Sequence, residues 1–404
     1  MQAAAQEREA AQPAGTPAAR AAALVPWLRD QEAAVEAGRR LTDAVAERLA
    51  DADLFRMTQP PRYGGLGLSP ADAWAAVFQV ARGCASSAWI TGLGAANVLM
   101  LGKFSAQAQA DVFLCGRPAI VPMLTGGVGR DIVAEPAPGG VILSGQWRYA
   151  SGIDVASWVG LLVPLPVAGS ADPEPHVVLV PADAFTVDAD SWHVLGMRGT
   201  GSRDIALPPT FVPAHRWTSW SLLLAGGKHP DCPNDEPLYD HPLNPVFAMS
   251  VAAPVLGLAS AVAECFRDGI AGRVSAGTKR PARETANAQA QLATGTATMD
   301  ILTRSLLADA ADLQAAIAAG RPPDLTARGG LRMRSAIACR LAVAEAQRMF
   351  AALGGSLLPA GTRIERQFRD LHAMSSHFLL QPDSIDAAYG CLLLGQDLPE
   401  GARL

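Results

Sequence analysis

The first quarter of the chain has the hydrophobic pattern of helices. Across residues 24–110, apolar positions return at near-helical spacing with charged residues between them. A Pro- and Gly-rich connector over residues 59–67 divides this stretch, and Ser69 followed by Pro70 is typical of a helix start. A further helical pattern covers residues 85–100. We therefore expect several helices before the first strand.

Between residues 118 and 217 the pattern changes to that of strands. Short apolar runs rich in Val, Leu and Ile, such as residues 158–163 and 176–180, are separated by turn residues. Gly139 and Gly140, which lie between two such runs, are typical of a hairpin turn. These features predict a β sandwich or a small barrel.

Helical periodicity returns after residues 222–245, a segment rich in Gly, Pro, Asn and Asp. The long apolar-periodic stretches that follow are typical of a helical bundle. They cover residues 247–266, 285–318, 328–353 and 366–379.

The three patterns predict an α+β chain with three folded domains. These are an N-terminal helical domain (21–116), a central β sandwich or barrel domain (117–220) and a C-terminal four-helix-type bundle (246–404). Residues 1–20 are Ala-rich with Pro, Gly and scattered charges, so we expect a flexible arm there rather than a signal peptide. Residues 221–245 are expected to form a connecting loop.

Composition narrows the functional classes. The chain has 404 residues, 50% of them apolar and 18% charged, with a net charge of −5. It can therefore bury a substantial core, and it lacks the basic excess of a nucleic-acid binder. No uncharged apolar run reaches the ~18 residues of a membrane span. The six cysteines form no C-x-x-C pair, which favours reduced thiols and a cytoplasmic location.

Several common site motifs are absent from the sequence. There is no phosphate-binding loop, and Gly92-Leu93-Gly94 lacks both the third glycine and the preceding strand of a dinucleotide fingerprint. His372 and His377 are five residues apart, about 140° around a helix, so they do not share a face as two metal ligands would. We therefore expect no bound metal. We also expect that any reaction with a nicotinamide cofactor takes place on a separate protein.

Four segments in series resemble the acyl-CoA dehydrogenase superfamily, and the resemblance extends from about residue 20 to residue 395. It implies an N-terminal helical domain, a central β domain and a C-terminal four-helix bundle. It also implies a flavin at the junction of the last two domains, usually in a homotetramer. The segments are residues 54–65 (with Pro-Pro-Arg-Tyr-Gly-Gly), 145–152 (Gly-Gln-Trp-Arg-Tyr-Ala-Ser-Gly), 192–213 (with Leu-Gly-Met-Arg-Gly-Thr-Gly-Ser) and 353–370 (with Leu-Gly-Gly-Ser and Arg-Gln-Phe-Arg-Asp).

Two motifs make the chain most similar to one branch of that superfamily, the oxygenase components of two-component flavin-dependent monooxygenases. Residues 149–158 read Tyr-Ala-Ser-Gly-Ile-Asp-Val-Ala-Ser-Trp, and residues 369–377 read Arg-Asp-Leu-His-Ala-Met-Ser-Ser-His. Enzymes of this branch take reduced FMN or FAD from a separate flavin reductase. They react it with O2 to a C4a-hydroperoxyflavin and hydroxylate an aromatic or polycyclic small molecule. The resemblance implies the same activity here, in a homotetramer or dimer.

The resemblance assigns catalytic roles to three side chains. Ser151 would hydrogen-bond flavin N5. His377 would deprotonate a phenolic substrate or hydrogen-bond the peroxide, since histidine titrates near neutrality, and His372 would support the pocket. Without the resemblance, Ser151 would be a strand-end serine that bonds its own turn, and His377 would be a core histidine on a buried helix.

The resemblance also implies the surroundings of flavin and substrate. Arg273, on the first bundle helix, would reach the flavin phosphate of a neighbouring subunit. Asn97 stands where many hydroxylases of the branch have a histidine, which leaves the substrate chemistry open. The other expected flavin contacts are Trp147, Ala150, Ser151, Gly152, Met197, Thr200, Gly354 and Gly355; the expected substrate pocket consists of Trp89, Asn97 and Phe378.

Three alternatives stay open at this point. The first is an acyl-CoA dehydrogenase, which needs a carboxylate base. No carboxylate lies between Asp370 and Asp383, where most such enzymes have one, so Glu264 is the remaining candidate. The second is an N- or S-oxygenase of the same branch. The third is a relative that binds flavin or another ligand without redox turnover.

Overall fold

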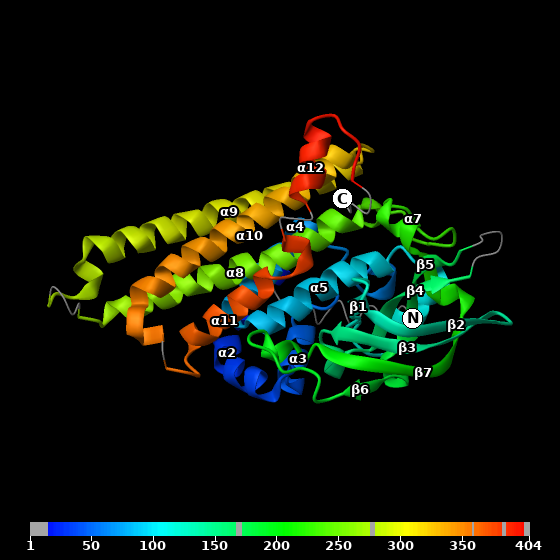
Figure 1. The fold of residues 1–404 in the computed structure, drawn as a ribbon, viewed down its shortest axis with the longest axis horizontal. Helices are drawn as coiled ribbons and strands as arrows, with labels where there is room; N and C mark the ends of the chain where they lie inside the picture. The colour runs from blue at the N-terminus through cyan, green and yellow to red at the C-terminus, as the bar shows by residue number, and fades with distance from the viewer. Residues whose placement is uncertain (1–14, 167–171, 275–278, 358, 382–384, 400–404) are drawn as a thin grey trace.

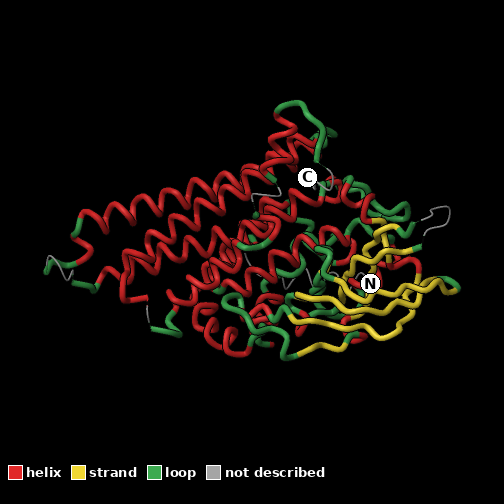
Figure 2. The backbone as a smooth tube through the Cα atoms, viewed as in Figure 1, coloured by secondary structure: helices red, strands yellow, loops and turns green. Residues whose placement is uncertain are grey.

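The computed structural model describes residues 15–166, 172–274, 279–357, 359–381 and 385–399. Helices come first, strands follow and long helices end the chain (Figure 1). The strands gather at one end of the molecule, and the bundle extends away from them as a long arm (Figure 2). The predicted α+β architecture with a helical, a β and a helical part is therefore confirmed.

The N-terminal part is helical, as predicted. Its first helix begins at Pro17, inside the expected arm, because the Thr16 side chain caps it by accepting a hydrogen bond from the Ala19 N–H (3.2 Å); residues 1–14 of that arm lie outside the described residues. Ser69 caps the fourth helix as expected. The elements are α2 (Pro17–Gly38), α3 (Asp43–Asp51), η1 (Pro61–Tyr63), α4 (Pro70–Gly83), α5 (Ala85–Leu101) and α6 (Ala106–Phe113).

Helix α5 lies at the centre of the molecule. All of its residues except Leu93 are buried, and it packs against α4, α8 and the loop before the last long strand. A helix that is apolar on all sides needs neighbours on all sides, and α5 has them because it separates the bundle from the β domain (Figure 1).

The central domain is a sandwich of two four-stranded sheets. One sheet has the strand order β1-β4-β5-β8 and the other has β2-β3-β7-β6. Gly139, with φ +77°, makes the turn of the predicted β2–β3 hairpin. The strands are β1 (Met123–Leu124), β2 (Gly129–Ala137), β3 (Gly140–Ala150), β4 (Trp158–Leu165), β5 (Glu174–Pro181), β6 (Thr186–Asp188), β7 (Arg203–Pro213) and β8 (Trp217–Ser219), with short 3-10 turns η2 (Ile153–Val155), η3 (Ala182–Ala184), η4 (Arg198–Thr200) and η5 (Ala214–Arg216).

The β1-β4-β5-β8 sheet is buried on both faces. One face joins Leu143 and Trp147 of the other sheet in the sandwich core. The opposite face, with Val177 and Leu179, packs on α5 and α6. This explains why β4 and β5 are almost uniformly apolar instead of alternating.

The C-terminal part is a bundle of long helices. The expected connecting loop contains two short helices. The first bundle helix begins at Leu243, a few residues before the predicted boundary, and Pro242 is its N-cap residue. The elements are α7 (Trp220–Leu224), η6 (Pro237–Asp240), α8 (Leu243–Ala271), η7 (Ala282–Glu284), α9 (Ala286–Ala318), α10 (Leu325–Leu353), η8 (Gly354–Leu357), α11 (Arg363–Ser375), η9 (Phe378–Leu380) and α12 (Asp386–Leu393).

Helix α8 is the core of this bundle. Among the described helices it alone is long and apolar enough to cross a membrane. Of its most apolar 18-residue stretch, 89% is buried inside the fold. Its apolar surface is therefore explained by its contacts with α4, α5, α9 and α10.

One predicted helix is too long. The pattern of residues 366–379 predicts continuous helix, but α11 ends at Ser375. The hydroxyls of Ser375 and Ser376 donate to the His372 carbonyl (3.1 and 2.8 Å), and such bonds compete with helix continuation. His377 then caps η9, so it is not a residue of a buried helix.

Candidate active site

Ser151 lies at the end of β3, in a turn fixed by backbone hydrogen bonds. Its N–H donates to the Tyr149 carbonyl, and the Gly152 N–H donates to the Thr200 carbonyl (both 2.8 Å). Tyr149 and Gly152 both have positive φ (+65° and +77°), which is unusual for a tyrosine and ordinary for a glycine. The strained turn directs Ser151 toward the start of β7.

Three hydroxyls form a chain at this point. Ser151 Oγ lies 2.7 Å from Ser202 Oγ, and Ser202 Oγ lies 2.7 Å from Thr200 Oγ1. Thr200 Oγ1 in turn donates to the Met197 carbonyl (2.8 Å). Ser151 and Thr200, both expected from the sequence, are thus brought together by Ser202, which was not singled out.

The loop that carries Thr200 is held by α11. The Met197 N–H donates to Asp370 Oδ1 (2.6 Å), and Arg369 Nη1 donates to the Leu195 carbonyl (2.8 Å). A Cβ at Gly196 would lie 2.3 Å from the Arg369 carbonyl oxygen, so the backbones approach as closely as glycine permits. The Arg-Asp pair of α11 therefore positions the Ser151 surroundings from another domain.

Asp370 is buried beneath this loop. It is 5% exposed, and burial raises the pKa of its carboxyl to about 6, against the opposing effect of the Met197 N–H. The carboxyl is a positioning group because its observed contact is to backbone.

Helix α5 forms the wall opposite Ser151. A Cβ at Gly152 would meet the Ile90 side chain at 3.1 Å. One turn further along α5, Gly94 is buried, yet a Cβ there would meet no atom within 4 Å. Asn97, on the next turn, donates from Nδ2 to the Val121 carbonyl (2.8 Å). Residues i, i+4 and i+7 share a helix face, so the free space beside Gly94 lies on the face of α5 that also carries Ile90 and Asn97.

Trp89 of α5 contacts His377. Their rings are 5.3 Å apart in an edge-to-face arrangement. Phe378 packs on His377 at 4.7 Å and is 50% exposed. The structure thus brings together Trp89, His377 and Phe378, which the sequence assigned to substrate and catalysis.

His377 is held in its neutral form. Burial lowers the pKa of its imidazole to about 4. Its Nδ1 accepts a hydrogen bond from the Leu379 N–H (3.4 Å). An accepting Nδ1 in a neutral ring places the hydrogen on Nε2, so the ring can offer Nε2–H as a donor.

Three expected residues make their contacts elsewhere in the structure. His372 faces α10, where its Nε2 lies 3.1 Å from Gln347 Oε1 and its ring packs on Phe368. Trp147 is 1% exposed in the sandwich core, in edge-to-face contact with Phe185. Ala150, the last residue of β3, is fully buried in the same core.

A second group of expected residues lies at the far end of the bundle. Arg273, two residues beyond the end of α8 and not on the helix itself, donates from Nη1 to the Leu353 carbonyl (2.6 Å). Its other guanidinium nitrogen would be 3.7 Å from a Cβ at Gly354, and a Cβ at Gly355 would meet nothing. This end of α8 points away from the β domain (Figure 1). Within one chain, Arg273, Gly354 and Gly355 are therefore far from Ser151.

Glu264 is engaged in a structural ion cluster. Its Oε1 accepts from Arg82 Nε (2.8 Å), and its Oε2 pairs with Arg29. Both oxygens are thus used to join α2, α4 and α8. A carboxylate with both oxygens occupied by guanidinium groups is unsuited to act as a base.

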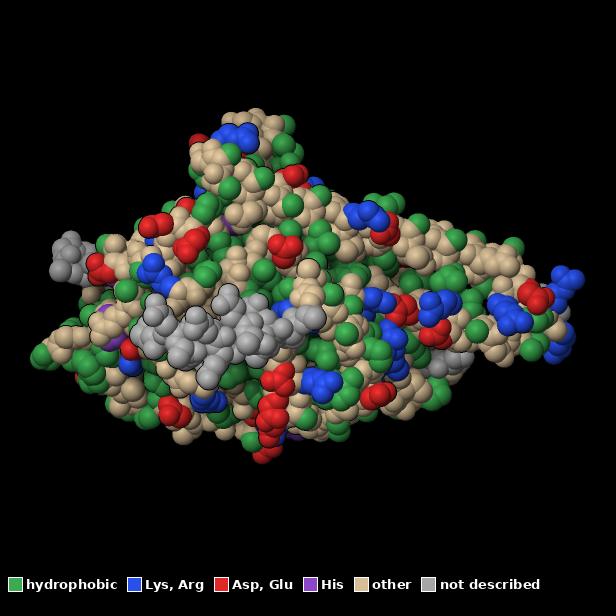
Figure 3. Space-filling model, turned by 180° about the vertical axis from the view of Figure 1, so that it is seen from behind, with side chains coloured by type: hydrophobic (Ala, Val, Ile, Leu, Met, Phe, Trp, Pro, Cys, Tyr) green, Lys and Arg blue, Asp and Glu red, His purple; other side chains and the backbone are tan. Residues whose placement is uncertain are grey.

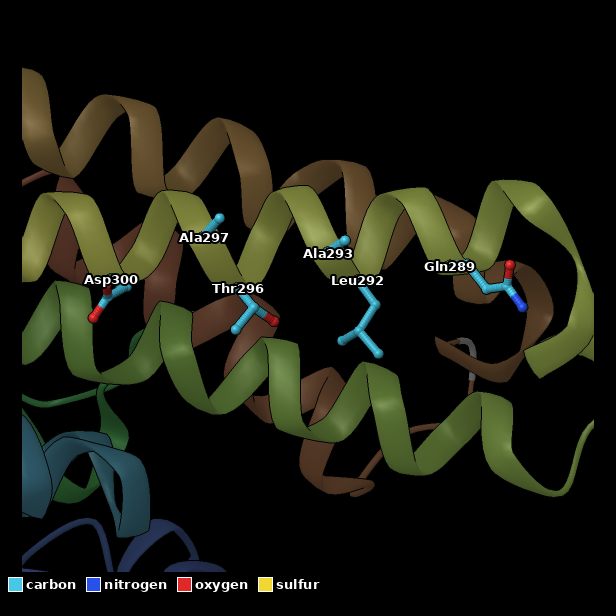
Figure 4. A pocket seen from close by; sticks show the side chains of 6 residues that line it. All are labelled: Gln289, Leu292, Ala293, Thr296, Ala297 and Asp300. Atoms are coloured by element: carbon cyan, nitrogen blue, oxygen red, sulfur yellow. The ribbon is translucent and has the colours of Figure 1, made fainter.

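A groove of about 670 Å³ runs along α9 (Figure 4). Leu292 and Thr296 point toward α8 there. No site residue expected from the sequence lines it, so it is separate from the candidate active site. The lining residues are Gln289, Leu292, Ala293, Thr296, Ala297 and Asp300.

Two family models match the chain. "Acyl-CoA dehydrogenase, N-terminal domain" matches residues 20–116, and "Acyl-CoA dehydrogenase, C-terminal domain" matches residues 249–382. Together the two ranges span more than half of the chain, on the predicted N-terminal helical domain and the predicted C-terminal bundle. The chain belongs to the acyl-CoA dehydrogenase superfamily.

Full-length relatives specify the branch. The oxygenase subunit HsaA of a flavin-dependent monooxygenase from Rhodococcus jostii (strain RHA1) is 29% identical, and the match covers 91% of this chain and 95% of that protein. The oxygenase component of an FADH2-dependent resorcinol hydroxylase from Rhizobium sp. (strain MTP-10005) is 29% identical over 95% of this chain and 94% of that protein. The crystal structure of 3-HSA hydroxylase from Rhodococcus sp. RHA1 superposes with a TM-score of 0.88, at 27% identity, over 96% of this chain and 98% of that chain. This protein is a homologue, over its full length, of the oxygenase components of two-component flavin-dependent monooxygenases, which confirms the motif-based prediction.

Proposed function

We propose that this oxygenase component hydroxylates an aromatic or polycyclic small molecule with O2, using reduced FMN or FAD that a separate reductase supplies. The observation that carries the proposal is the convergence of two sequence motifs on α5. Residues 149–158 place Gly152, the neighbour of Ser151, beside Ile90, and residues 369–377 place His377 beside Trp89. These motifs are far apart in the chain and meet only in the folded protein.

The residues present fit a flavin between the β domain and α5. Gly152 is buried and lacks a side chain where the turn meets Ile90 of α5, and the neighbouring Ser151 hydroxyl has unused hydrogen-bonding capacity beyond its contact to Ser202. When bound there, reduced flavin would supply the activation of O2. Ser151 would hold flavin N5, and Met197 and Thr200 would border the ring from the loop fixed by α11.

His377 would act on the substrate side through Nε2–H. An imidazole with a pKa near 4 is a weak base at neutral pH, so the geometry favours hydrogen-bond donation over abstraction of a phenolic proton. The space beside Gly94 would hold part of the substrate, with Trp89, Asn97 and Phe378 around it.

The chemical class of the substrate follows from the relatives. One of them is named a resorcinol hydroxylase, and the aromatic rings of Trp89 and Phe378 suit another ring. Asn97 is already bonded to the Val121 carbonyl, so it would orient a polar group of the substrate and would carry no proton. N- or S-oxygenation of a heteroaromatic ring would use the same surroundings.

The proposed partners are a flavin reductase and further copies of this chain. The oxygenase relatives are named as subunits or components, which implies a reductase. We expect a homotetramer or a dimer, because Arg273 lies too far along the bundle to share one flavin with Ser151 of the same chain. On the face shown in Figure 3, acidic and basic side chains of the described residues are interspersed, which fits small-molecule chemistry, and we expect a cytoplasmic location.

The test is turnover with a generic flavin reductase, NADH, FAD or FMN, and a panel of phenols, indoles and thiophenes under 18O2. The expected result is one labelled oxygen atom in an aromatic product, detected by mass spectrometry, in an amount that requires this protein. Acyl-CoA oxidation with an artificial electron acceptor, and no labelled product, would instead identify a dehydrogenase. Flavin binding without turnover in either assay would identify a non-redox relative.

A further inference from the structure

The hydroxyl chain at Ser151 has a fixed direction. Each hydroxyl carries one hydrogen, and Thr200 uses its hydrogen on the Met197 carbonyl. The 2.7 Å contact between Thr200 and Ser202 can therefore be filled only by the Ser202 hydrogen. Ser202 then has none left, so its 2.7 Å contact with Ser151 must use the hydrogen of Ser151.

The start of this chain is held in place from two sides. Met197 is fixed by the hydrogen bond from its N–H to Asp370 and has a left-handed φ of +59°. Thr200 and Ser202 are 1% and 4% exposed, so solvent does not compete for their hydroxyls. The direction of all three bonds is thus set by the backbone of the loop.

We infer that Ser202 and Thr200 make Ser151 a hydrogen-bond acceptor toward the bound cofactor, so that the site selects reduced over oxidised flavin. This inference rests on the proposed function. Reduced flavin carries a hydrogen on N5 and can donate to Ser151, whereas N5 of oxidised flavin bears only a lone pair and would face the lone pairs of Ser151. Ser202 and Thr200 are positioning residues, since they act through Ser151.

The experiment measures the dissociation constants of oxidised and reduced flavin, the latter under anaerobic conditions. The wild type is expected to bind the reduced form more tightly. Ser202→Ala releases the Ser151 hydroxyl to rotate and donate, so the ratio of the two constants should fall about tenfold, the order of one hydrogen bond. The potential of the bound flavin should fall by about 30 mV for the two-electron couple.

Two variants at Thr200 distinguish the effect of the hydrogen-bond direction from the effect of side-chain packing. Thr200→Val removes the hydroxyl at similar volume and should reproduce the effect of Ser202→Ala, and Thr200→Ser keeps the hydroxyl and should retain the wild-type ratio of the two constants. Thr210→Val, on the exposed part of the same β7 strand, is the matched control and should leave the ratio unchanged.

The outcomes distinguish this inference from the proposed function. Flavin binding with an unchanged ratio in both Ser202→Ala and Thr200→Val overturns the directed chain, whatever the turnover. A wild type that binds neither form of flavin overturns the proposed function and this inference together. A ratio that falls in both variants and is retained in Thr200→Ser establishes the directed chain.

Discussion

At the scale of single residues, the state of His377 decides which chemistry it can perform. The imidazole is neutral, with its hydrogen on Nε2, because burial lowers its pKa and the Leu379 N–H occupies Nδ1. Trp89 and Phe378 hold the ring between them. In the proposed reaction, a donor in this position would orient the reacting groups and would need no proton transfer at neutral pH.

Two substitutions at His377 test whether the residue acts as a hydrogen-bond donor or as a general base. His377→Ala should lower the rate of product formation on the order of 10²–10⁴-fold while flavin binding is retained. His377→Asn keeps a neutral N–H donor and should recover part of that loss. The measurement is single-turnover product formation with preloaded reduced flavin. Equal loss in both variants would favour a base, and full activity in His377→Ala would remove the residue from catalysis.

The same pKa shift predicts an acid-sensitive fold. The pKa of His377 is about 4 in the native protein against an ordinary value of 6.5, so the unfolded chain binds more protons between these pH values. The free energy of unfolding therefore falls as the pH drops from 6.5 to 4, by up to about 3 kcal/mol per histidine. The buried His241 has a similar shift. The stability of His377→Asn, measured by thermal unfolding, should depend less on pH between 6.5 and 4 than that of wild type, and an unchanged pH dependence would contradict the assignment.

At the scale of elements, two helical glycines make opposite predictions. A Cβ at Gly257 of α8 would lie 2.4 Å from the Phe78 carbonyl oxygen of α4, so Gly257→Ala should destabilise the fold by about 1–3 kcal/mol. Gly94→Ala in α5 meets no atom and should be neutral or up to about 1 kcal/mol stabilising. Thermal unfolding midpoints compare the two.

Gly94→Ala should also change substrate selection. The added methyl group would narrow the proposed substrate space beside Gly94, so the KM for the bulkiest accepted ring should rise about tenfold, while that for a small phenol changes little. Steady-state kinetics on both substrates provide the measurement. Equal KM values for wild type and variant would place the substrate elsewhere.

The contact between α11 and the Thr200 loop predicts a pH effect of opposite sign. The pKa of Asp370 is raised to about 6 from an ordinary 3.8, so the native state binds more protons in this window and stability is lost as the pH rises through it. Asp370→Asn keeps an acceptor for the Met197 N–H without a charge. It should be at least as stable as wild type at pH 7.5, whereas Asp370→Ala should be less stable, by thermal unfolding.

The sequence was sufficient to predict most helices and strands. For the contact between Ser151 and Ser202, it identified Ser151 and not its partner. Helix caps and turns could be predicted because local chemistry determines them, as at Ser69 and at Gly139. The helical periodicity of the bundle helices could be predicted for the same reason. The end of α11 was wrong, since two serine hydroxyls compete for the His372 carbonyl. Ser202 was missed because its importance depends on the approach of β7 to β3, which a linear pattern does not encode.

At the scale of the whole molecule, the expected flavin site is divided. Ser151 lies at the junction of the β domain with α5, whereas Arg273 and Gly354 meet at the distal end of the bundle (Figure 1). The middle turns of α9 and α10 also expose large apolar side chains: Ile301 is 65% exposed and Leu341 is 50% exposed. A second copy that covers these helices would bring its Arg273 to the flavin of the first.

This arrangement predicts complementation between two defective chains. Arg273→Ala should weaken flavin binding about 10–100-fold, the order of a lost charge-assisted hydrogen bond to phosphate, whereas Arg304→Ala, on the exposed face of α9, should not. Co-expression of Arg273→Ala with Ser151→Ala, carrying different tags, yields mixed oligomers. If each site takes residues from two chains, about a half of the sites in a mixed dimer, or a little over about a quarter of those in randomly mixed tetramers, are intact. Flavin titration of the doubly purified oligomer should detect them as a tight class. Absence of that class in a confirmed mixed oligomer would place Arg273 and Ser151 in the same site of one chain, or Arg273 outside the site.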